Sequence, residues 1–552
     1  MPLSRRAFTS GALTAALGIE FASPLFGEGF SSTSPALAAI HAFAEADLAF
    51  NRLPGMTLGL VTGDGRRTIL NFGYANADAR TPITSQTLFQ IGSISKVMIA
   101  AVVHQLVAEG RINLSDRIST LLPELPLPAA NGIELQHLLD HVAGLADDPP
   151  VFAPGGLWTA YAPGAHWHYS NTGYEILGLL VERLTAKPLA QVLRERIFLN
   201  LSMSRSRGAI VDADRLFYAQ GYEPADRVAA YTRGAGLAPA PWVDMTAAAG
   251  CVASTADDML HFLLTLASAV QGKGGFGLSP EQARLLTGHA VPSNVPGMNY
   301  GNGLMHVGEN GRQYLHHTGG MLSFSSSFHV DAASGACAFA SCTLSAFADY
   351  RPRLLTRFAV DVLTSASLGR PIPAAPALDL GLPNAAAYAG RYMGPSGSFE
   401  IRTASPLTIL AGGRSAPLVP IAEDIFRSPH PGFRDFSLFF ERSAGAVALA
   451  NYGPNSYTRE GSGAIPPASD PVLARLAGRY INDNPWYGPM IVVERGGRLW
   501  IGTETPMTRL GDNLWRVGRD EWSPERAAFT DLMGGRPQSF IFSGVKFPRH
   551  QV

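Results

Sequence analysis

Cysteine and lysine are scarce in this 552-residue sequence. Its three cysteines, Cys251, Cys337 and Cys342, are too few for the disulfide network that stabilises small secreted domains. The offset between Cys337 and Cys342 is odd, so one strand would carry them on opposite faces, where we expect small core residues. Only four of the 43 basic residues are lysines, and 44 acidic residues bring the formal net charge to −1. This balance does not indicate a basic surface for nucleic acid.

Several patterns typical of other protein classes are also missing. No Gly-x-Ser-x-Gly motif is present, which argues against an α/β-hydrolase fold. His166 and His168 have a spacing that metal ligands can have, but no third ligand is placed to complete a site. We therefore expect no metal and no cofactor. Beyond the N-terminal region no apolar stretch is long enough to cross a bilayer, so we expect no membrane span in the mature chain.

The N-terminus resembles an export signal. Ser4-Arg5-Arg6-Ala7-Phe8 is similar to the twin-arginine signature, and residues 11–25 are weakly apolar. The alternative is an unstructured tail that carries two arginines by chance. Ala36-Leu37-Ala38 fits a cleavage site, but a site near residue 23 fits equally well, because Ser34-Pro35 is typical of a helix start. We predict an export signal over residues 1–30 and a periplasmic or secreted protein.

Residues 31–367 are predicted to form one α+β domain. Its two ends supply strands 56–62, 68–74, 325–330 and 337–341, with helices over 34–51 and 352–363. Helices and loops occupy residues 112–270, where Ser254 and Asp257 are expected to form a capping box. Strands from both ends of the region predict one antiparallel sheet with a helical subdomain.

The last third of the sequence contains an internal repeat. Tyr388-Ala389-Gly390-Arg391-Tyr392 returns about 88 residues later as Leu476-Ala477-Gly478-Arg479-Tyr480. Short alternating runs and glycine turns surround both copies, as in small antiparallel barrels. We predict a linker over residues 368–380, then two β-barrels over 381–465 and 468–552. Neither contains a Ser/His/Asp cluster, so we interpret both as packing or shielding modules.

Ser93-Ile94-Ser95-Lys96 points most directly to chemistry. A spacing of three residues places a hydroxyl and an amine on one face of a helix. A serine needs a neighbouring base to attack a carbonyl, and a desolvated lysine can take part in such a network. Lys96 precedes the apolar run 97–103, where a buried lysine without a partner would cost free energy. The alternative is a serine that only caps a helix.

Two further motifs contribute candidate groups. Tyr169-Ser170-Asn171 opens a helix predicted over residues 172–184. A phenol near an ammonium can act as a base if its pKa is lowered, and the Asn171 amide can bind a substrate amide. His317-Thr318-Gly319-Gly320 precedes a strand, and the Gly320 N–H could join that of Ser93 to bind an oxyanion. Alone, these motifs would indicate aromatic packing and a glycine-rich hairpin.

Two nearby features are given structural interpretations. His141 is predicted to lie within an apolar helix and is expected to be a hydrogen-bonded core residue and not a base. Asp147-Asp148 stands before Pro149 and is expected to form a loop turn.

Taken together, the three motifs resemble the signatures of the serine β-lactamase and penicillin-binding protein superfamily, in its class C β-lactamase-like branch. The resemblance covers residues 35–365 and implies an antiparallel sheet flanked by helices with a helical subdomain. It also implies that Ser93 is the nucleophile, that Lys96 and Tyr169 handle protons and that Asn171 contacts the substrate amide. His317, Gly319 and Gly320 would line the cleft.

One departure from the superfamily pattern concerns the substrate. Many members have lysine where this sequence has His317, which gives them a cation for a substrate carboxylate, whereas histidine is mostly neutral at pH 7. We therefore expect small-molecule or short peptide substrates without a free C-terminal carboxylate. The layout of one such domain and two barrels resembles bacterial D-aminopeptidases, which implies a serine hydrolase that forms an acyl-enzyme. The alternatives are an esterase, a weak β-lactamase or a penicillin-binding sensor that is acylated without turnover.

Overall fold

The chain is described by a computed structural model over residues 34–127, 132–378, 382, 384–404 and 406–550. The predicted export signal lies outside the described residues. Among the helices within these ranges, none combines the length and the apolar character needed to cross a membrane.

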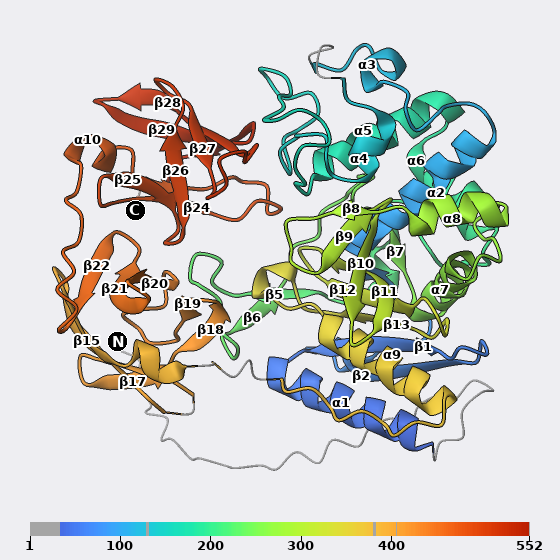
Figure 1. The fold of residues 1–552 in the computed structure, drawn as a ribbon, viewed down its shortest axis with the longest axis horizontal. Helices are drawn as coiled ribbons and strands as arrows, with labels where there is room; N and C mark the ends of the chain where they lie inside the picture. Colours follow the sequence, from blue (N-terminus) through green and yellow to red (C-terminus); the bar gives the residue numbers. More distant parts are fainter. Residues whose placement is uncertain (1–33, 128–131, 379–381, 383, 405, 551–552) are drawn as a thin grey trace, which may run out of the picture.

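A nine-stranded antiparallel sheet organises the first part of the chain (Figure 1). Its strand order is β3-β2-β1-β13-β12-β11-β10-β9-β8. The strands are β1 (Gly55–Val61), β2 (Arg67–Asn76), β3 (Thr81–Pro82), β8 (Val291–Pro292), β9 (Met298–Gly301), β10 (Leu304–Glu309), β11 (Arg312–Gly320), β12 (Ser325–Asp331) and β13 (Cys337–Cys342). Strands β1 and β2 pair with each other, and β1 also pairs with β13. Strands from both ends of the domain therefore share one sheet, as the sequence predicts.

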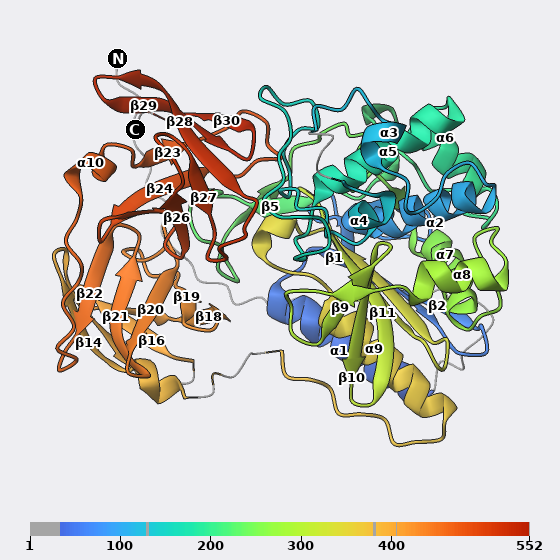
Figure 2. The same cartoon turned by 45° about the horizontal axis from the view of Figure 1, so that its top comes forward.

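Helices cover both faces of this sheet. On one face α1 (Pro35–Asn51) packs against α9 (Arg353–Ser367) (Figure 2). The Phe43 and Phe358 rings of these helices are 4.8 Å apart. The opposite face packs against the helical subdomain. Cys337 lies in the core between the sheet and the helical subdomain, whereas Cys342 lies in the core between the sheet and helices α1 and α9. The two thiols therefore face opposite sides of β13, as the odd offset predicts.

The helical subdomain lies between the two sets of strands in the chain. Its helices are α2 (Ser95–Ala108), α3 (Ile118–Leu121), α4 (Leu135–Leu139), α5 (Asn171–Thr185), α6 (Leu189–Leu193), α7 (Ala256–Val270) and α8 (Pro280–Gly288). Two short antiparallel strand pairs accompany them, β4 (Phe89–Gln90) with β7 (Ala253–Ser254) and β5 (Tyr222–Pro224) with β6 (Leu237–Pro239).

Two helix starts in this subdomain differ from the predicted ones. The cap of α7 is Thr255, whose hydroxyl accepts from the Asp258 N–H, so the predicted box of Ser254 and Asp257 is wrong by one residue. Ser254 instead lies in strand β7. Ser93 lies in a 3₁₀ turn, η1 (Gly92–Ile94), directly before α2, and not within the helix itself.

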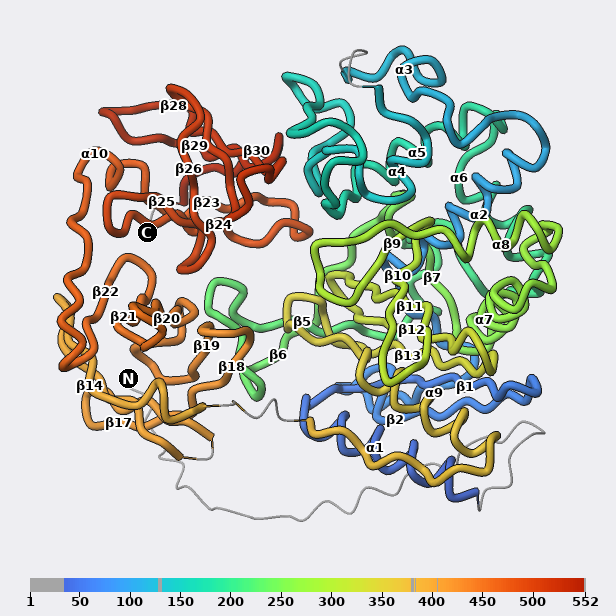
Figure 3. The backbone as a smooth tube through the Cα atoms, in the orientation of Figure 1, coloured from blue at the N-terminus to red at the C-terminus, as the bar shows by residue number. Residues whose placement is uncertain are grey.

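The C-terminal region forms two barrel-like antiparallel sheets, as the repeat predicts (Figure 3). The first contains β14 (Gly390–Gly394), β15 (Gly397–Arg402), β16 (Thr408–Ala411), β17 (Arg414–Pro417), β18 (Val419–Ala422), β19 (Ile425–Arg427), β20 (Leu438–Ser443), β21 (Ala446–Tyr452) and β22 (Asn455–Arg459). The second follows helix α10 (Pro471–Ala474) and contains β23 (Gly478–Tyr480), β24 (Met490–Arg495), β25 (Arg498–Ile501), β26 (Thr505–Arg509), β27 (Trp515–Val517), β28 (Arg526–Met533), β29 (Arg536–Phe542) and β30 (Val545–Pro548). A bridge between Tyr480 and Arg549 brings the two ends of the second sheet together.

The two barrels repeat a local structure as well as a sequence motif. The buried Tyr392 hydroxyl donates to the Tyr388 carbonyl at 2.8 Å, and the buried Tyr480 hydroxyl donates to the Leu476 carbonyl at 2.7 Å. Each tyrosine thereby ties the start of its first strand to the preceding turn, because a buried hydroxyl needs a hydrogen-bond partner.

Candidate active site

Ser93 is held where a turn of the chain meets the end of strand β11. The close approach requires glycine on both sides. A Cβ on Gly319 would lie 1.8 Å from the Ile91 carbonyl oxygen, and a Cβ on Gly92 would lie 2.7 Å from the Gly320 nitrogen. Gly92 also has φ +55°, a conformation that favours glycine. The backbone of β11 therefore contacts the residue before Ser93 directly, which brings the first and third sequence motifs together.

Lys96 is fully buried and makes three polar contacts. Its Nζ atom lies 3.2 Å from Ser93 Oγ, 2.7 Å from Asn171 Oδ1 and 2.8 Å from the Ala249 carbonyl oxygen. Burial lowers the pKa of Lys96 to about 8, although nearby carboxylates, Asp147 first among them, oppose that shift. The predicted pair of Ser93 and Lys96 is thus in direct contact.

Tyr169 lies beside this pair. The Lys96 Nζ atom is 4.9 Å from the centre of its ring, and the phenol interacts with the Ser93 side chain. Burial nevertheless raises the pKa of Tyr169 above its usual value, and contact with Ser93 only partly opposes this. The expectation that the ammonium lowers this pKa is therefore wrong, because desolvation of the phenolate outweighs every other influence. The phenol stays protonated at neutral pH.

Asn171 links Lys96 to the half-buried carboxylate of Asp147, a residue expected from the sequence to form only a loop turn. Its Oδ1 atom accepts from Lys96, while its Nδ2 atom donates to Asp147 Oδ1 at 3.1 Å. The Asn171 backbone N–H donates to the same oxygen at 3.2 Å. Burial raises the pKa of Asp147 to about 7, and the neighbouring carboxylates of Asp148 and Glu525 raise it further. Asp147 thus orients Asn171. The pair Asp147-Asp148 within an otherwise apolar segment is the sequence signal that points to such a role.

His317 is brought to the site but is enclosed by protein. Only 1% of it is exposed, its Nε2 atom lies 3.2 Å from the Tyr300 hydroxyl and its Nδ1 atom lies 2.6 Å from the Thr318 carbonyl oxygen. Burial lowers its pKa to about 3, with Lys96 adding to the effect. Its side chain therefore supplies no cation and has no free ring nitrogen for a substrate, whereas Gly319 and Gly320 form the neighbouring backbone.

His141 is a core residue, as expected, but it lies in the turn after α4 with φ +61° and not within a helix. It is buried, and its Nδ1 atom accepts the Ser170 backbone N–H at 3.1 Å. Its ring packs 4.3 Å from the ring of Tyr169. This contact fixes the segment that carries Tyr169 and Asn171.

The second barrel contacts the site, which nothing in the sequence indicates. Glu525 Oε1 accepts the Asp147 N–H at 2.7 Å and lies 2.9 Å from His168 Nε2. Trp486, in the loop between β23 and β24, hydrogen-bonds to the carboxylate of Asp148. Figure 3 shows this barrel beside the loops of the helical subdomain. The two histidines considered as metal ligands have other partners, since the His166 ring stacks on Trp522 with centres 4.7 Å apart.

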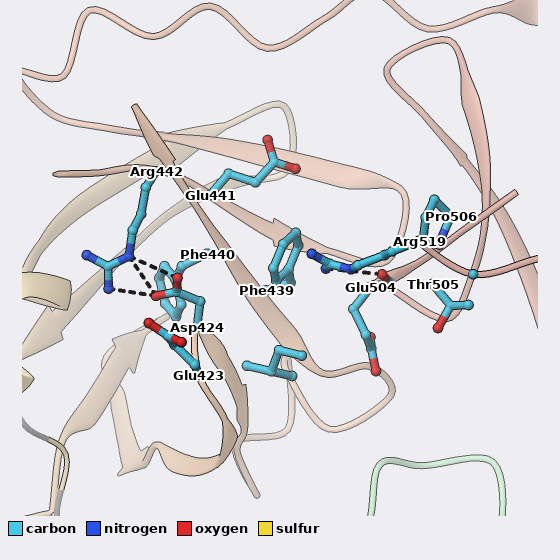
Figure 4. A pocket seen from close by; sticks show the side chains of 12 residues that line it. Glu423, Asp424, Phe439, Phe440, Glu441, Arg442, Glu504, Thr505, Pro506 and Arg519 are labelled. Carbon is cyan, nitrogen blue, oxygen red and sulfur yellow. Dashed lines mark hydrogen bonds and ion pairs between the residues drawn. The ribbon is translucent and has the colours of Figure 1, made fainter. Parts of the chain in front are cut away.

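A separate hollow lies between the two barrels and does not touch these groups (Figure 4). It encloses about 610 Å³ and is lined by residues of both barrels. Its charged groups are already paired in part: Arg442 binds Asp424 through Nη2 at 2.7 Å, and Arg519 Nη2 lies 3.4 Å from the Glu504 carbonyl oxygen. None of its lining residues is a predicted site residue.

Comparison with known proteins gives consistent results for the first part of the chain. The family model described as Beta-lactamase matches residues 40–358. A β-lactamase of Escherichia coli (strain K12) is 30% identical over 181 residues, which are 31% of this chain and 48% of the relative. A β-lactamase of Pseudomonas fluorescens is 27% identical over 224 residues, 38% of this chain and 59% of the relative. The chain spans about half the length of these curated relatives.

Solved structures share the fold. The octameric penicillin-binding protein homologue from Pyrococcus abyssi is 21% identical and covers 77% of this chain and 98% of its own, with a TM-score of 0.55. The D-amino acid amidase from Ochrobactrum anthropi SV3, complexed with L-phenylalanine amide, is 24% identical and covers 60% of this chain and 99% of its own, with a TM-score of 0.51. The chain therefore belongs to the β-lactamase family, within the superfamily of serine β-lactamases and penicillin-binding proteins that its three motifs indicate.

Proposed function

We propose that the protein is a serine hydrolase that forms an acyl-enzyme on Ser93. The observation that carries this proposal is the set of partners of Lys96. A neutral amine has two N–H bonds and one lone pair, and the Asn171 and Ala249 oxygens can only accept hydrogen bonds. The lone pair then faces the third partner, the Ser93 hydroxyl, at 3.2 Å. With its pKa lowered to about 8, Lys96 can lose its proton near neutral pH and accept that of Ser93.

The remaining steps use groups around this pair. The alkoxide of Ser93 attacks the substrate carbonyl, and the backbone N–H groups of Ser93 and Gly320 bind the oxyanion that develops. Tyr169 keeps its proton because its pKa is raised, so it donates to the leaving group. The expelled amine or alcohol carries that proton away, and Lys96 returns a proton to the phenol. Water then attacks the acyl-enzyme with the proton transfers reversed. Tyr169 takes the proton of water as its own proton passes to Lys96, and Lys96 protonates the departing Ser93 oxygen.

The substrates that fit best are amides and esters of amino acids with a free amino group, as in a D-aminopeptidase. His317 is neutral, so it does not anchor a substrate carboxylate. Asp148 is an exposed carboxylate that contacts the side chains of Asn171 and Trp486, next to the group expected to bind the substrate amide. A carboxylate in this place attracts an ammonium group. The preference for D over L stereochemistry follows from the resemblance in layout and is part of the proposal.

A second candidate substrate class is favoured by Arg351. The Cβ position of Gly320 lies 2.4 Å from one of its terminal nitrogens, and among the described residues it has no carboxylate within ion-pair distance. A half-buried arginine at the end of β11 could bind a substrate carboxylate, as a β-lactam presents. The two candidates therefore differ in the charge that the substrate carries.

A panel of substrates separates these candidates. We expect hydrolysis of D-alanine p-nitroanilide to exceed that of L-alanine p-nitroanilide, nitrocefin and p-nitrophenyl butyrate. Activity on nitrocefin alone would contradict the proposed substrate class and favour the β-lactam candidate. A burst of one equivalent without steady turnover would favour a sensor that is acylated but not regenerated.

A further inference from the structure

The second barrel places one carboxylate directly against the catalytic segments of the first domain. Glu525 immediately precedes β28, and its side chain is 13% exposed. Its Oε1 atom accepts the Asp147 N–H at 2.7 Å and lies 2.9 Å from His168 Nε2, while its Oε2 atom accepts from the Ser543 hydroxyl. One side chain thus ties two loops of the helical subdomain to the turn between β29 and β30 of the barrel.

The contacts of Glu525 continue to the nucleophile. Glu525 binds the backbone N–H of Asp147. The carboxylate of Asp147 in turn accepts hydrogen bonds from the backbone N–H and the side-chain amide of Asn171. Asn171 in turn accepts from Lys96, which contacts Ser93. Every link in this path is a hydrogen bond of 2.7–3.2 Å. His168, the other partner of Glu525, is next to Tyr169 in the chain.

The surroundings hold Glu525 firmly in place. The preceding Pro524 carbonyl accepts the Trp158 indole N–H at 2.8 Å. Trp522 stacks on His166 with ring centres 4.7 Å apart and planes 6° from parallel. Burial raises the pKa of Glu525, but the bonds from His168, Ser543 and the Asp147 N–H outweigh burial and leave that pKa below its usual value. The carboxylate is therefore charged at neutral pH and fixed relative to both loops.

We propose that Glu525 is a positioning residue for the reaction: the second barrel uses it to fix Asp147, and through Asp147 to orient Asn171 toward Lys96. The effect on Ser93 chemistry rests on the proposed serine hydrolase function. The orientation of Asn171 does not, because it is a property of the folded protein. The barrel is then a working part of the active site and not only the packing or shielding module expected from its sequence.

The barrel offers a matched control residue, Glu494. This buried carboxylate accepts the Asp470 and Gly497 N–H groups and the Ser469 hydroxyl, so it also uses backbone N–H groups and a serine. All of these partners lie in the second barrel or in the segment that leads to it, outside the catalytic domain. Loss of Glu494 tests barrel stability alone, whereas loss of Glu525 tests stability and positioning.

The experiment uses the full chain and two readouts. We compare Glu525→Ala with Glu494→Ala in the rate of Ser93 labelling by a fluorophosphonate and in amide hydrogen exchange at Asp147 and Asn171. We expect Glu525→Ala to slow labelling on the order of 10- to 100-fold, because small displacements of catalytic groups cost this much. We also expect faster exchange at both amides, and little change in either readout with Glu494→Ala. Glu525→Gln, whose amide oxygen can still accept the Asp147 N–H, should recover part of the rate.

The outcomes are distinct. Equal labelling and unchanged exchange at Asn171 in Glu525→Ala would overturn the proposal, as would an equal loss in Glu494→Ala. If Glu525→Ala does not fold, Glu525→Asp keeps the charge but withdraws it from the Asp147 N–H, and wild-type labelling in that variant would also overturn it. If the wild-type protein is never labelled at Ser93, the proposed function fails, while exchange at Asn171 still decides the role of Glu525.

Discussion

Burial of a single lysine determines how the proposed chemistry depends on pH. Lys96 has no lone pair while it is protonated, and its pKa is lowered to about 8 because burial disfavours the ammonium. Asp147, with a pKa raised to about 7, ionises in the same range and favours the ammonium. The two groups titrate as a pair, so a measured profile reports the pair and not one residue.

The activity should therefore rise with pH through about 7–8. Replacement of Asp147 by Asn removes the charge that favours the ammonium, so the pKa of Lys96 falls and the acid limb should move to lower pH. The measurement is kcat/KM from about pH 6 to about pH 9 for both proteins. A flat wild-type profile, or an acid limb that moves to higher pH in Asp147→Asn, would contradict a base role for Lys96.

Asp148 should determine whether a substrate amino group is recognised. Its carboxylate is exposed and contacts Asn171 and Trp486, so Asp148→Asn should lower kcat/KM for alanine p-nitroanilide by about 10-fold, a loss of about 1.4 kcal/mol. p-Nitrophenyl butyrate lacks an ammonium group and serves as the control substrate. Equal losses on both substrates would show that the carboxylate acts on the site in general and not on the amine.

The contact between β11 and η1 depends on glycines, and a methyl group should separate the two elements. A Cβ on Gly319 would overlap the Ile91 carbonyl, so Gly319→Ala must shift β11 away from Ser93. We expect a loss of activity on the order of 100-fold, because the Gly320 N–H moves away from the oxyanion. Gly288→Ala at the end of α8 is the control, since a Cβ there meets nothing within 4 Å.

Circular dichroism and kinetics separate the two effects in these variants. Gly319→Ala should keep the far-UV spectrum of the wild type while kcat falls, and Gly288→Ala should preserve both. Wild-type kcat in Gly319→Ala would mean that the close approach of β11 is not required.

The sequence predicted the elements well where one pattern dominates. The pairing of the strands predicted over 56–62 and 68–74 with the later strands, and the opposite faces of Cys337 and Cys342, follow from strand alternation. The cap of α7 was missed by one residue because Ser254 and Thr255 are both good caps, and pairing of β7 with β4 decides between them. The pKa of Tyr169 was predicted in the wrong direction, since a sequence does not reveal how completely a ring is buried.

The arrangement of the three parts was beyond the sequence. The repeat at Tyr392 and Tyr480 predicted two barrels, and the same tyrosine hydrogen bond recurs in both. Nothing in the pattern around Trp486, Trp522 or Glu525 distinguishes residues that face another domain from residues on an ordinary barrel surface. Contacts between parts of a chain depend on shape and not on periodicity, so they emerge only from the folded structure.

Docking of the second barrel should weaken when its aromatic contact is removed. Trp522→Ala removes the stack on His166, which is worth about 1 kcal/mol. Amide exchange in the loop of residues 163–168 should then accelerate. Trp500→Ala is the control, because Trp500 packs against Arg495 within the barrel. Equal exchange in this loop for both variants would mean that the stack does not contribute to docking.

The most direct test of the whole account is mass spectrometry of the protein after exposure to a fluorophosphonate. We predict one adduct, on Ser93, that forms faster as the pH rises through about 8 and is lost in Lys96→Ala. Modification of any other residue, or undiminished labelling of Ser93 without the Lys96 amine, would contradict it.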